Sequence, residues 1–226
     1  MSRSTGTTLP LPPEEGGHRF PGFDVLRQTS HWDDATRAAV TDRLHDLPPI
    51  RFFTPAEEAA ATVVLDQLMN QRPAPGEPRI ELTRMVDSRL AEDETDGWHY
   101  DDMPDDGTAW QRSLAALDDD AQAVHGAAVA QLDWETQTVL LASIKDSTDE
   151  HWHDLPRKRV WDLWSRYAAT AFYSHPYAWN EIGFSGPAYP RGYKNPGVDR
   201  LEPFEVHDVR QDDDPVAGRA GAKDRS

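Results

Sequence analysis

Residues 160–194 read VWDLWSRYAATAFYSHPYAWNEIGFSGPAYPRGYK and hold nearly half of the aromatic side chains of this 226-residue chain. Rings of this size dominate the apolar surface that a protein buries. In the first half, apolar residues recur at spacings of three and four, which predicts one face of a helix. The residues on this face are Val160, Leu163, Trp164, Tyr167, Ala168, Ala171 and Phe172. Pro176 disfavours helical geometry in His175 before it, so the helix is predicted to end or kink there.

The second half of the stretch loses the helical period, and its glycines and prolines argue against regular structure. Two interpretations are open for so aromatic a loop. It folds back onto the helices as a structural wrap, or it offers its rings to another protein. Large rings rimmed by polar groups are typical of a partner-binding surface, and Arg191 is a suitable directed hydrogen-bond donor. The predicted partner-binding residues are Trp179, Asn180, Phe184, Tyr189, Arg191 and Tyr193.

The clearest helix start in the chain is Thr54-Pro55-Ala56-Glu57. Thr54 can accept a hydrogen bond from a free N–H group of the first turn, and Glu57 three residues later completes a capping box. Pro55 fits the first helical position because its missing N–H would have no partner there. This pattern predicts a helix that runs on through an apolar face to Leu68.

Aspartates predict further helix starts along the chain. Asp33 or Asp34 can cap a helix that runs through Leu44, Asp118 can cap another, and Asp133 a third. In the helices after Asp118 and Asp133, the apolar side chains are expected to face inward. Val124 and Val139 are among these inward-facing residues.

The pattern as a whole predicts an all-α fold, an irregular bundle of about six or seven helices with a long aromatic C-terminal loop rich in glycine and proline. No segment alternates as a strand would. We expect a single helical domain over 23–206. The flanking segments 1–22 and 207–226 are predicted to be disordered, because small and polar residues dominate them.

The composition excludes several function classes. The net charge is −17 with a sequence pI of about 4.8, and such a field repels nucleic-acid phosphates and anionic membranes. No run approaches the ~20 apolar residues that span a bilayer, so no direct membrane insertion is expected. Residues 1–17 contain no apolar run of the kind found in export signals, so no export signal is expected there. We expect a cytoplasmic protein, with export bound to a partner, or trimming of a leader, as the alternatives.

Few residues are candidates for metal binding or for nucleophilic catalysis. Because cysteine is absent, thiolate ligands and thiol nucleophiles are excluded. His151, His153 and Asp154 offer ligand types that suit zinc, iron or manganese, but residues two apart share a side only in an extended segment. The alternative is a surface turn rich in histidine. Ser185 lacks the full G-x-S-x-G pattern and follows a helix rather than a strand. No catalytic residue is predicted.

Three segments near the C-terminus resemble the signature of the gluconate 2-dehydrogenase subunit 3 family: FYS at 172–174, WNEIG at 179–183 and GPAYPRGY at 186–193. The resemblance is specific over 160–198 and looser over 51–159, where Phe52-Phe53-Thr54-Pro55 resembles the usual opening of the family. It does not extend over 1–30 or 207–226.

The resemblance implies a small, helical, non-catalytic subunit. Its partner would be a large flavin-dependent dehydrogenase of the glucose–methanol–choline (GMC) oxidoreductase type, in some cases with a cytochrome c subunit. The chain has no G-x-G-x-x-G turn and no phosphate-binding P-loop, so no cofactor is expected in it and FAD is expected in the partner. Two alternatives stay open: a stand-alone metal-dependent enzyme that uses His151 and His153, and a transient maturation chaperone for the flavoprotein.

Overall fold

The computed structural model describes residues 19–72, 79–98, 100–195, 197 and 200–209. Most of the predicted disordered ends, 1–22 and 207–226, lies outside these residues. The chain forms two compact units. We call residues 46–174 the helical unit, and residues 19–45 with 175–209 the terminal unit. The single domain expected over 23–206 stays a prediction.

The predicted all-α fold is confirmed, because nearly all regular structure in the described residues is helical. The helical unit contains α2 (Pro55–Met69), α3 (Leu82–Ala91), α4 (Asp106–His125), the 3-10 helix η2 (Val129–Gln131), α5 (Trp134–Asp146), β1 (His151–Trp152), β2 (Leu155–Pro156) and α6 (Arg157–Ser174). The terminal unit contains the 3-10 helix η1 (Val25–His31), α1 (Asp34–His45) and α7 (Pro176–Ile182).

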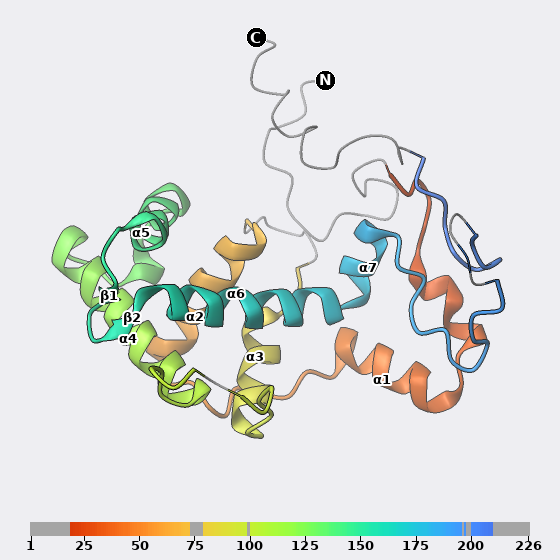
Figure 1. Ribbon diagram of the computed structural model, residues 1–226, viewed down its shortest axis with the longest axis horizontal. Helices are drawn as coiled ribbons and strands as arrows, with labels where there is room; N and C mark the ends of the chain where they lie inside the picture. The colour runs from red at the N-terminus through yellow and green to blue at the C-terminus, as the bar shows by residue number, and fades with distance from the viewer. Residues whose placement is uncertain (1–18, 73–78, 99, 196, 198–199, 210–226) are drawn as a thin grey trace, which may run out of the picture. The chain divides into compact units, whose positions relative to one another are not determined.

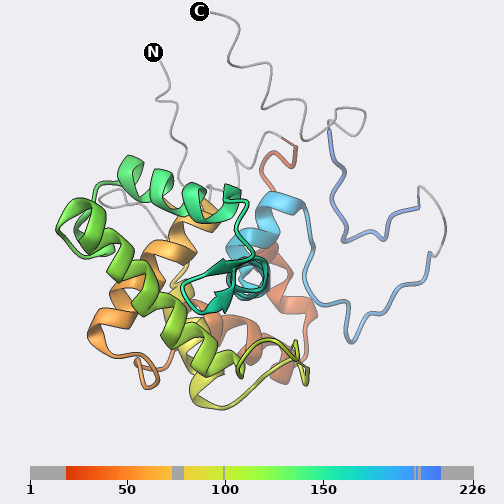
Figure 2. The ribbon, with the colours of Figure 1, turned by 60° about the vertical axis from the view of Figure 1, so that its left-hand side comes forward.

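Helix α2 is the central element of the helical unit (Figure 1, Figure 2). It packs against α3, α4, α5, α6 and η2. Apart from Asp66, its buried positions are alanine, valine and leucine, and small side chains such as Ala60 and Ala61 let neighbouring helices approach closely. Helix α6 buries the whole predicted apolar face, from Val160 to Phe172. This face supplies the large rings of the core, with Trp110 of α4 beside them.

The predicted helix starts are confirmed at three places. Thr54 and Glu57 form both hydrogen bonds of the capping box at the start of α2. Asp33 accepts from the backbone N–H of Thr36 at 2.8 Å ahead of α1. Asp133 accepts from the backbone N–H of Thr136 at 2.8 Å ahead of α5. These caps need only residues three apart, so the sequence alone was sufficient to find them.

Three predictions about α4 and α5 were wrong. Helix α4 runs unbroken through Asp118, whose carboxylate accepts from the backbone N–H of Val129 at 2.8 Å instead of starting a helix. Val124 and Val139 are each 69% exposed rather than inward-facing. Single apolar side chains commonly remain at a protein surface, because polar residues cannot cover it completely.

The segment before α2 is held by one fully buried carboxylate. Asp87 of α3 is 0% exposed and accepts from the backbone N–H groups of Arg51, Phe52 and Phe53 at 2.7, 2.9 and 2.8 Å. Three donors around one carboxylate offset the cost of burying its charge. Asp87 therefore fixes the direction in which the chain enters α2.

His175 is the first residue of the second segment of the terminal unit. Its Nδ1 atom accepts from the backbone N–H of Tyr177 at 3.2 Å and caps α7. Its side chain is buried. Burial lowers the pKa of His175 from 6.5 to about 4, the charge of Arg43 acts in the same direction, and a hydrogen bond to the backbone of Arg43 offsets part of the shift. The imidazole is therefore neutral in the folded chain at neutral pH.

We expect Asp87→Ala to lower the free energy of unfolding by about 3 kcal/mol, because it leaves one buried and two partly buried backbone N–H groups without their acceptor. The measurement is denaturation by urea. Asp101→Ala is the matched control, since Asp101 is exposed, and it should change stability by less than about 0.5 kcal/mol. Equal effects of the two changes would contradict the role given to Asp87.

We expect acid to destabilise the terminal unit through His175. Between pH 6.5 and about 4, the unfolded chain binds a proton at this residue that the folded chain does not. The free energy of unfolding therefore keeps its full value above pH 6.5. As the pH falls below that value, it decreases by up to about 3 kcal/mol. Hydrogen exchange of the α7 amides across this range measures it. His175→Asn, which can still cap the helix, should flatten the pH dependence, whereas His207→Asn, at an exposed site, should not.

Candidate partner-binding surface of the terminal unit

Two segments from distant parts of the sequence share the core of the terminal unit. Trp179 of α7 is 4% exposed and clusters with Val25, Trp32 and Val40. Asn180 is 2% exposed, and its Oδ1 atom accepts from the backbone N–H of Val25 at 2.8 Å. Both were predicted to contact a partner. The structure instead places both side chains in the interior, where they hold the two segments together.

The first part of the loop after α7 packs tightly. Gly186 has φ of 75°, and a Cβ atom there would lie 2.5 Å from the ring atom Cζ2 of Trp32, so only glycine fits. Ser185 before it is 4% exposed, and its hydroxyl has no hydrogen-bond partner among the described residues. Residues 185–186 therefore agree with the interpretation of the loop as a structural wrap.

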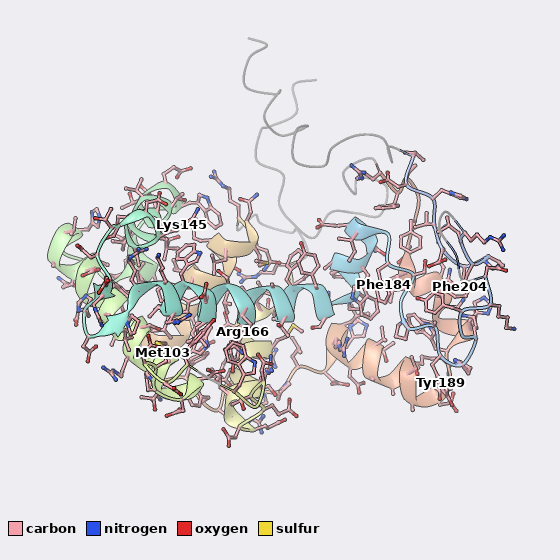
Figure 3. All side chains as sticks on the ribbon, viewed as in Figure 1. Met103, Lys145, Arg166, Phe184, Tyr189 and Phe204 are labelled. Carbon is pink, nitrogen blue, oxygen red and sulfur yellow. The ribbon has the colours of Figure 1, made fainter. Side chains whose placement is uncertain are left out.

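The loop also presents large rings to solvent. Phe184 is 38% exposed, Tyr189 65% and Tyr193 59%. Phe184 contacts Trp179 edge-to-face, with ring centroids 5.2 Å apart. Part of the Phe184 ring is therefore packed against the core, and part is open to solvent. Phe184 and Tyr189 are labelled on the terminal unit in Figure 3. The same chain segment thus serves as a wrap at its start and carries exposed rings further on.

Arg191 lies against two residues that the sequence analysis did not single out. Its Nη1 atom donates to Oε1 of Gln28 at 2.9 Å, and its Cζ atom lies 3.8 Å from the ring centroid of Phe204. No local pattern indicates either contact, because Gln28 is 163 residues away in sequence. These side chains border a cavity of about 550 Å³ within the terminal unit.

The histidine candidates lie in the helical unit, on a two-stranded antiparallel hairpin directly before α6 (Figure 2). His153 lies in the turn of this hairpin, and its Nε2 atom is 2.9 Å from Oδ1 of Asp120. The indole N–H of Trp152 donates to Oδ2 of the same carboxylate at 2.7 Å. Asp154 pairs with Arg112. Within the described residues, no group of three or more His, Asp or Glu side chains is placed to hold a metal ion.

A second cavity, of about 240 Å³, lies between α6 and residues 98–106 at the start of α4, and is lined by side chains from both. Arg166 pairs with Asp96 and with Asp106, the latter at 3.2 Å, and hydrogen bonds from Arg89 and Arg166 lower the pKa of Asp96 despite its partial burial. Arg159 lies over the ring of Tyr100, 3.5 Å from its centroid. Because Arg166, Asp96 and Asp106 are paired with one another, this region is a weaker candidate for binding than the terminal unit.

Comparison of the sequence with models of known protein families identifies the family of this chain. The family model described as gluconate 2-dehydrogenase subunit 3 matches residues 55–186, more than half of the chain. The chain belongs to the gluconate 2-dehydrogenase subunit 3 family. No curated protein and no solved structure matched it. Across the described residues, no helix is both long and apolar enough to cross a membrane.

The part shared with subunit 3 proteins runs from α2 through α7 and ends at Gly186. It includes the buried residues Trp179 and Asn180, which shape the terminal unit. It stops before Tyr189, Arg191 and Tyr193. The fold of this subunit 3 chain thus lies mostly in the matched region, whereas most of its exposed loop lies beyond it.

We expect Trp179→Ala to destabilise the terminal unit by about 3–5 kcal/mol, because it removes a buried indole from the core. Tyr189→Ala should change stability by less than about 0.5 kcal/mol, since that ring is mostly in water. Thermal unfolding and limited proteolysis of both variants measure the difference. A Trp179→Ala chain as stable as the parent would contradict the burial described above.

Proposed function

We propose that this chain is a non-catalytic accessory subunit that binds and stabilises a flavin-dependent, gluconate 2-dehydrogenase-like dehydrogenase of the GMC type, which acts on a sugar or polyol. Family membership supports the general role, because the family is named as a subunit of gluconate 2-dehydrogenase. The sequence supports an external cofactor, since it lacks the glycine-rich turn that holds a dinucleotide. FAD would then be bound by the partner.

The observation that carries the proposed contact is the exposure of Phe184, Tyr189 and Tyr193 on a loop with a rigid base. Aromatic side chains are enriched among residues that dominate binding energy, and tyrosine loses little conformational entropy when it is immobilised. The base of the loop is fixed by Trp179 and by the close approach of Gly186 to Trp32. A partner therefore meets a loop whose base is already fixed, which lowers the entropic cost of binding.

Charge adds a constraint on the partner. The chain carries a net charge of −17, so a docking face with basic residues would associate faster and more specifically than an acidic one. This electrostatic component is screened by salt, whereas contacts of the aromatic rings are not. Association should therefore become slower, but not disappear, as the salt concentration rises.

The test is capture of the flavoprotein after coexpression with a GMC-type dehydrogenase from the same genome. We expect the double variant Tyr189→Ala Tyr193→Ala to bind at least about tenfold more weakly than the parent. The control is Val124→Ala Val139→Ala, which removes two exposed apolar side chains from the helical unit and should leave capture unchanged. Thermal unfolding confirms that both double variants are folded.

Two results would oppose this proposal. A stable, monodisperse monomer that captures no flavoprotein would remove the accessory role. Capture that both double variants retain in full would move the contact away from the loop. A complex that forms with the newly made flavoprotein and dissociates after FAD is bound would instead identify a maturation chaperone.

A further inference from the structure

Helix α6 presents three charged side chains on one face. Arg159, Asp162 and Arg166 are spaced by three and four residues, so they lie along the same side of the helix. All three line the cavity of about 240 Å³ in the helical unit, together with Leu163 and Ser165 of the same helix. Figure 3 labels Arg166 on this helix. One helix therefore supplies charge, a hydroxyl group and apolar surface to the same cavity.

The remainder of the cavity wall is mostly aromatic and apolar. It consists of Trp98, Tyr100 and Met103 from the segment before α4, together with Asp106 of α4. The two rings meet edge-to-face, with centroids 5.2 Å apart, and Trp98 is 50% exposed. Met103 and Leu163 are buried. A side chain that enters the cavity would therefore meet an accessible indole and two smaller apolar groups.

The two arginines of the wall already have carboxylate partners. Arg166 pairs with Asp96 and Asp106. The Nε atom of Arg159 lies 3.6 Å from a carboxylate oxygen of Asp102. Because three carboxylates surround two guanidinium groups, these arginines do not favour a further anion in the cavity.

Asp162 is the carboxylate of this wall that has no matching cation. It is exposed, and its side chain forms no ion pair or hydrogen bond with the described residues. The neighbouring segment 92–106 adds negative charge, because eight of its fifteen residues are acidic and none is lysine or arginine. The electrostatic field around the cavity therefore favours a cation.

We propose that this cavity takes one arginine side chain of a partner protein, whose guanidinium pairs with Asp162 and stacks on the open part of the Trp98 ring. Arginine suits each part of the wall. Its planar cation binds both oxygens of a carboxylate and stacks on aromatic rings, and its apolar stem can pack on Met103 and Leu163. The identity of the partner as the flavoprotein rests on the proposed function.

The size of the cavity supports a single side chain as its occupant. Its volume of about 240 Å³ is below the roughly 300–1,000 Å³ that is typical of small-molecule pockets. Arginine is also enriched among the residues that dominate the binding energy of protein interfaces. An arginine here would add a charged contact on the helical unit to the aromatic contacts proposed for Tyr189 and Tyr193.

The test titrates the intact chain, without any partner, with the blocked tripeptide acetyl-Gly-Arg-Gly-amide and follows the indole N–H signal of Trp98 by NMR. At low salt we expect a Kd on the order of 1 mM. The same peptide with glutamate in place of arginine should not bind. With leucine it should bind at least about tenfold more weakly, because the ion pair is lost. Salt should weaken binding of the arginine peptide, since Asp162 is exposed.

Variants assign the binding to this wall. Asp162→Asn keeps the shape of the side chain and removes its charge, so the arginine peptide should bind at least about fivefold more weakly. Asp101→Asn is the matched control: it removes the same charge from an exposed residue outside the wall and should have little effect. Trp98→Ala should also weaken binding, read by calorimetry, whereas Tyr173→Ala, at a ring that is 51% exposed elsewhere on the helical unit, should not.

The same pair of aspartate variants tests the partner. If the flavoprotein supplies the arginine, Asp162→Asn should weaken its capture by at least about tenfold, and Asp101→Asn should leave capture unchanged. Circular dichroism checks that each variant is folded.

Four outcomes would overturn this inference. They are absence of binding of the arginine peptide, equal weakening by Asp162→Asn and Asp101→Asn, equal affinity for the arginine and leucine peptides, and capture of the flavoprotein that Asp162→Asn retains in full. Equal affinity for the two peptides would identify an apolar anchor instead. Because the titrations contain no partner, their failure is distinct from failure of the proposed function, in which the parent chain captures no flavoprotein.

Discussion

The terminal unit depends on one joint between segments that lie 155 residues apart in sequence, the hydrogen bond from Val25 to Asn180 beside the buried ring of Trp179. Closing such a long loop has an entropic cost, which a buried indole and a satisfied amide offset. The loop after α7 starts from this joint. The start of this loop, with its exposed rings and its arginine further on, is therefore positioned by residues that are themselves buried.

The charged side chains differ in how completely their hydrogen bonds are satisfied. In the helical unit, Arg166 is matched by Asp96 and Asp106, and Asp87 is matched by three backbone donors. Such closed networks stabilise one conformation and leave little for a ligand. Arg191 differs, because one corner is bonded and one edge is not. In a chain with a net charge of −17, an arginine that forms no ion pair with any carboxylate of the described residues calls for a physical explanation.

Sequence reasoning succeeded where the deciding interaction is local. Thr54 with Glu57, and Asp133 with Thr136, cap their helices across three residues, so a short window contains the whole signal. It failed where the partner is further away. Asp118 has the pattern of a cap, but Val129, eleven residues on, uses its carboxylate while the helix continues. The predicted partner-binding residues divide in the same manner. Tyr189 and Tyr193 are exposed and their contact with a partner stays a prediction, whereas Trp179 and Asn180 are interior. The contacts of Arg191 with Gln28 and Phe204 were not anticipated.

By itself, the sequence determined the helical class, the lack of thiol chemistry and of a dinucleotide-binding turn, and a family signature. It also showed that the C-terminal loop is unusually aromatic. Each of these follows from composition or from residues within a few positions of one another. Only the tertiary structure decided which rings are inside and which are outside, and which edge of Arg191 is left unbonded. Those outcomes depend on where residues 19–45 pack against the loop, and no spacing within the loop encodes the position of a segment so distant in sequence.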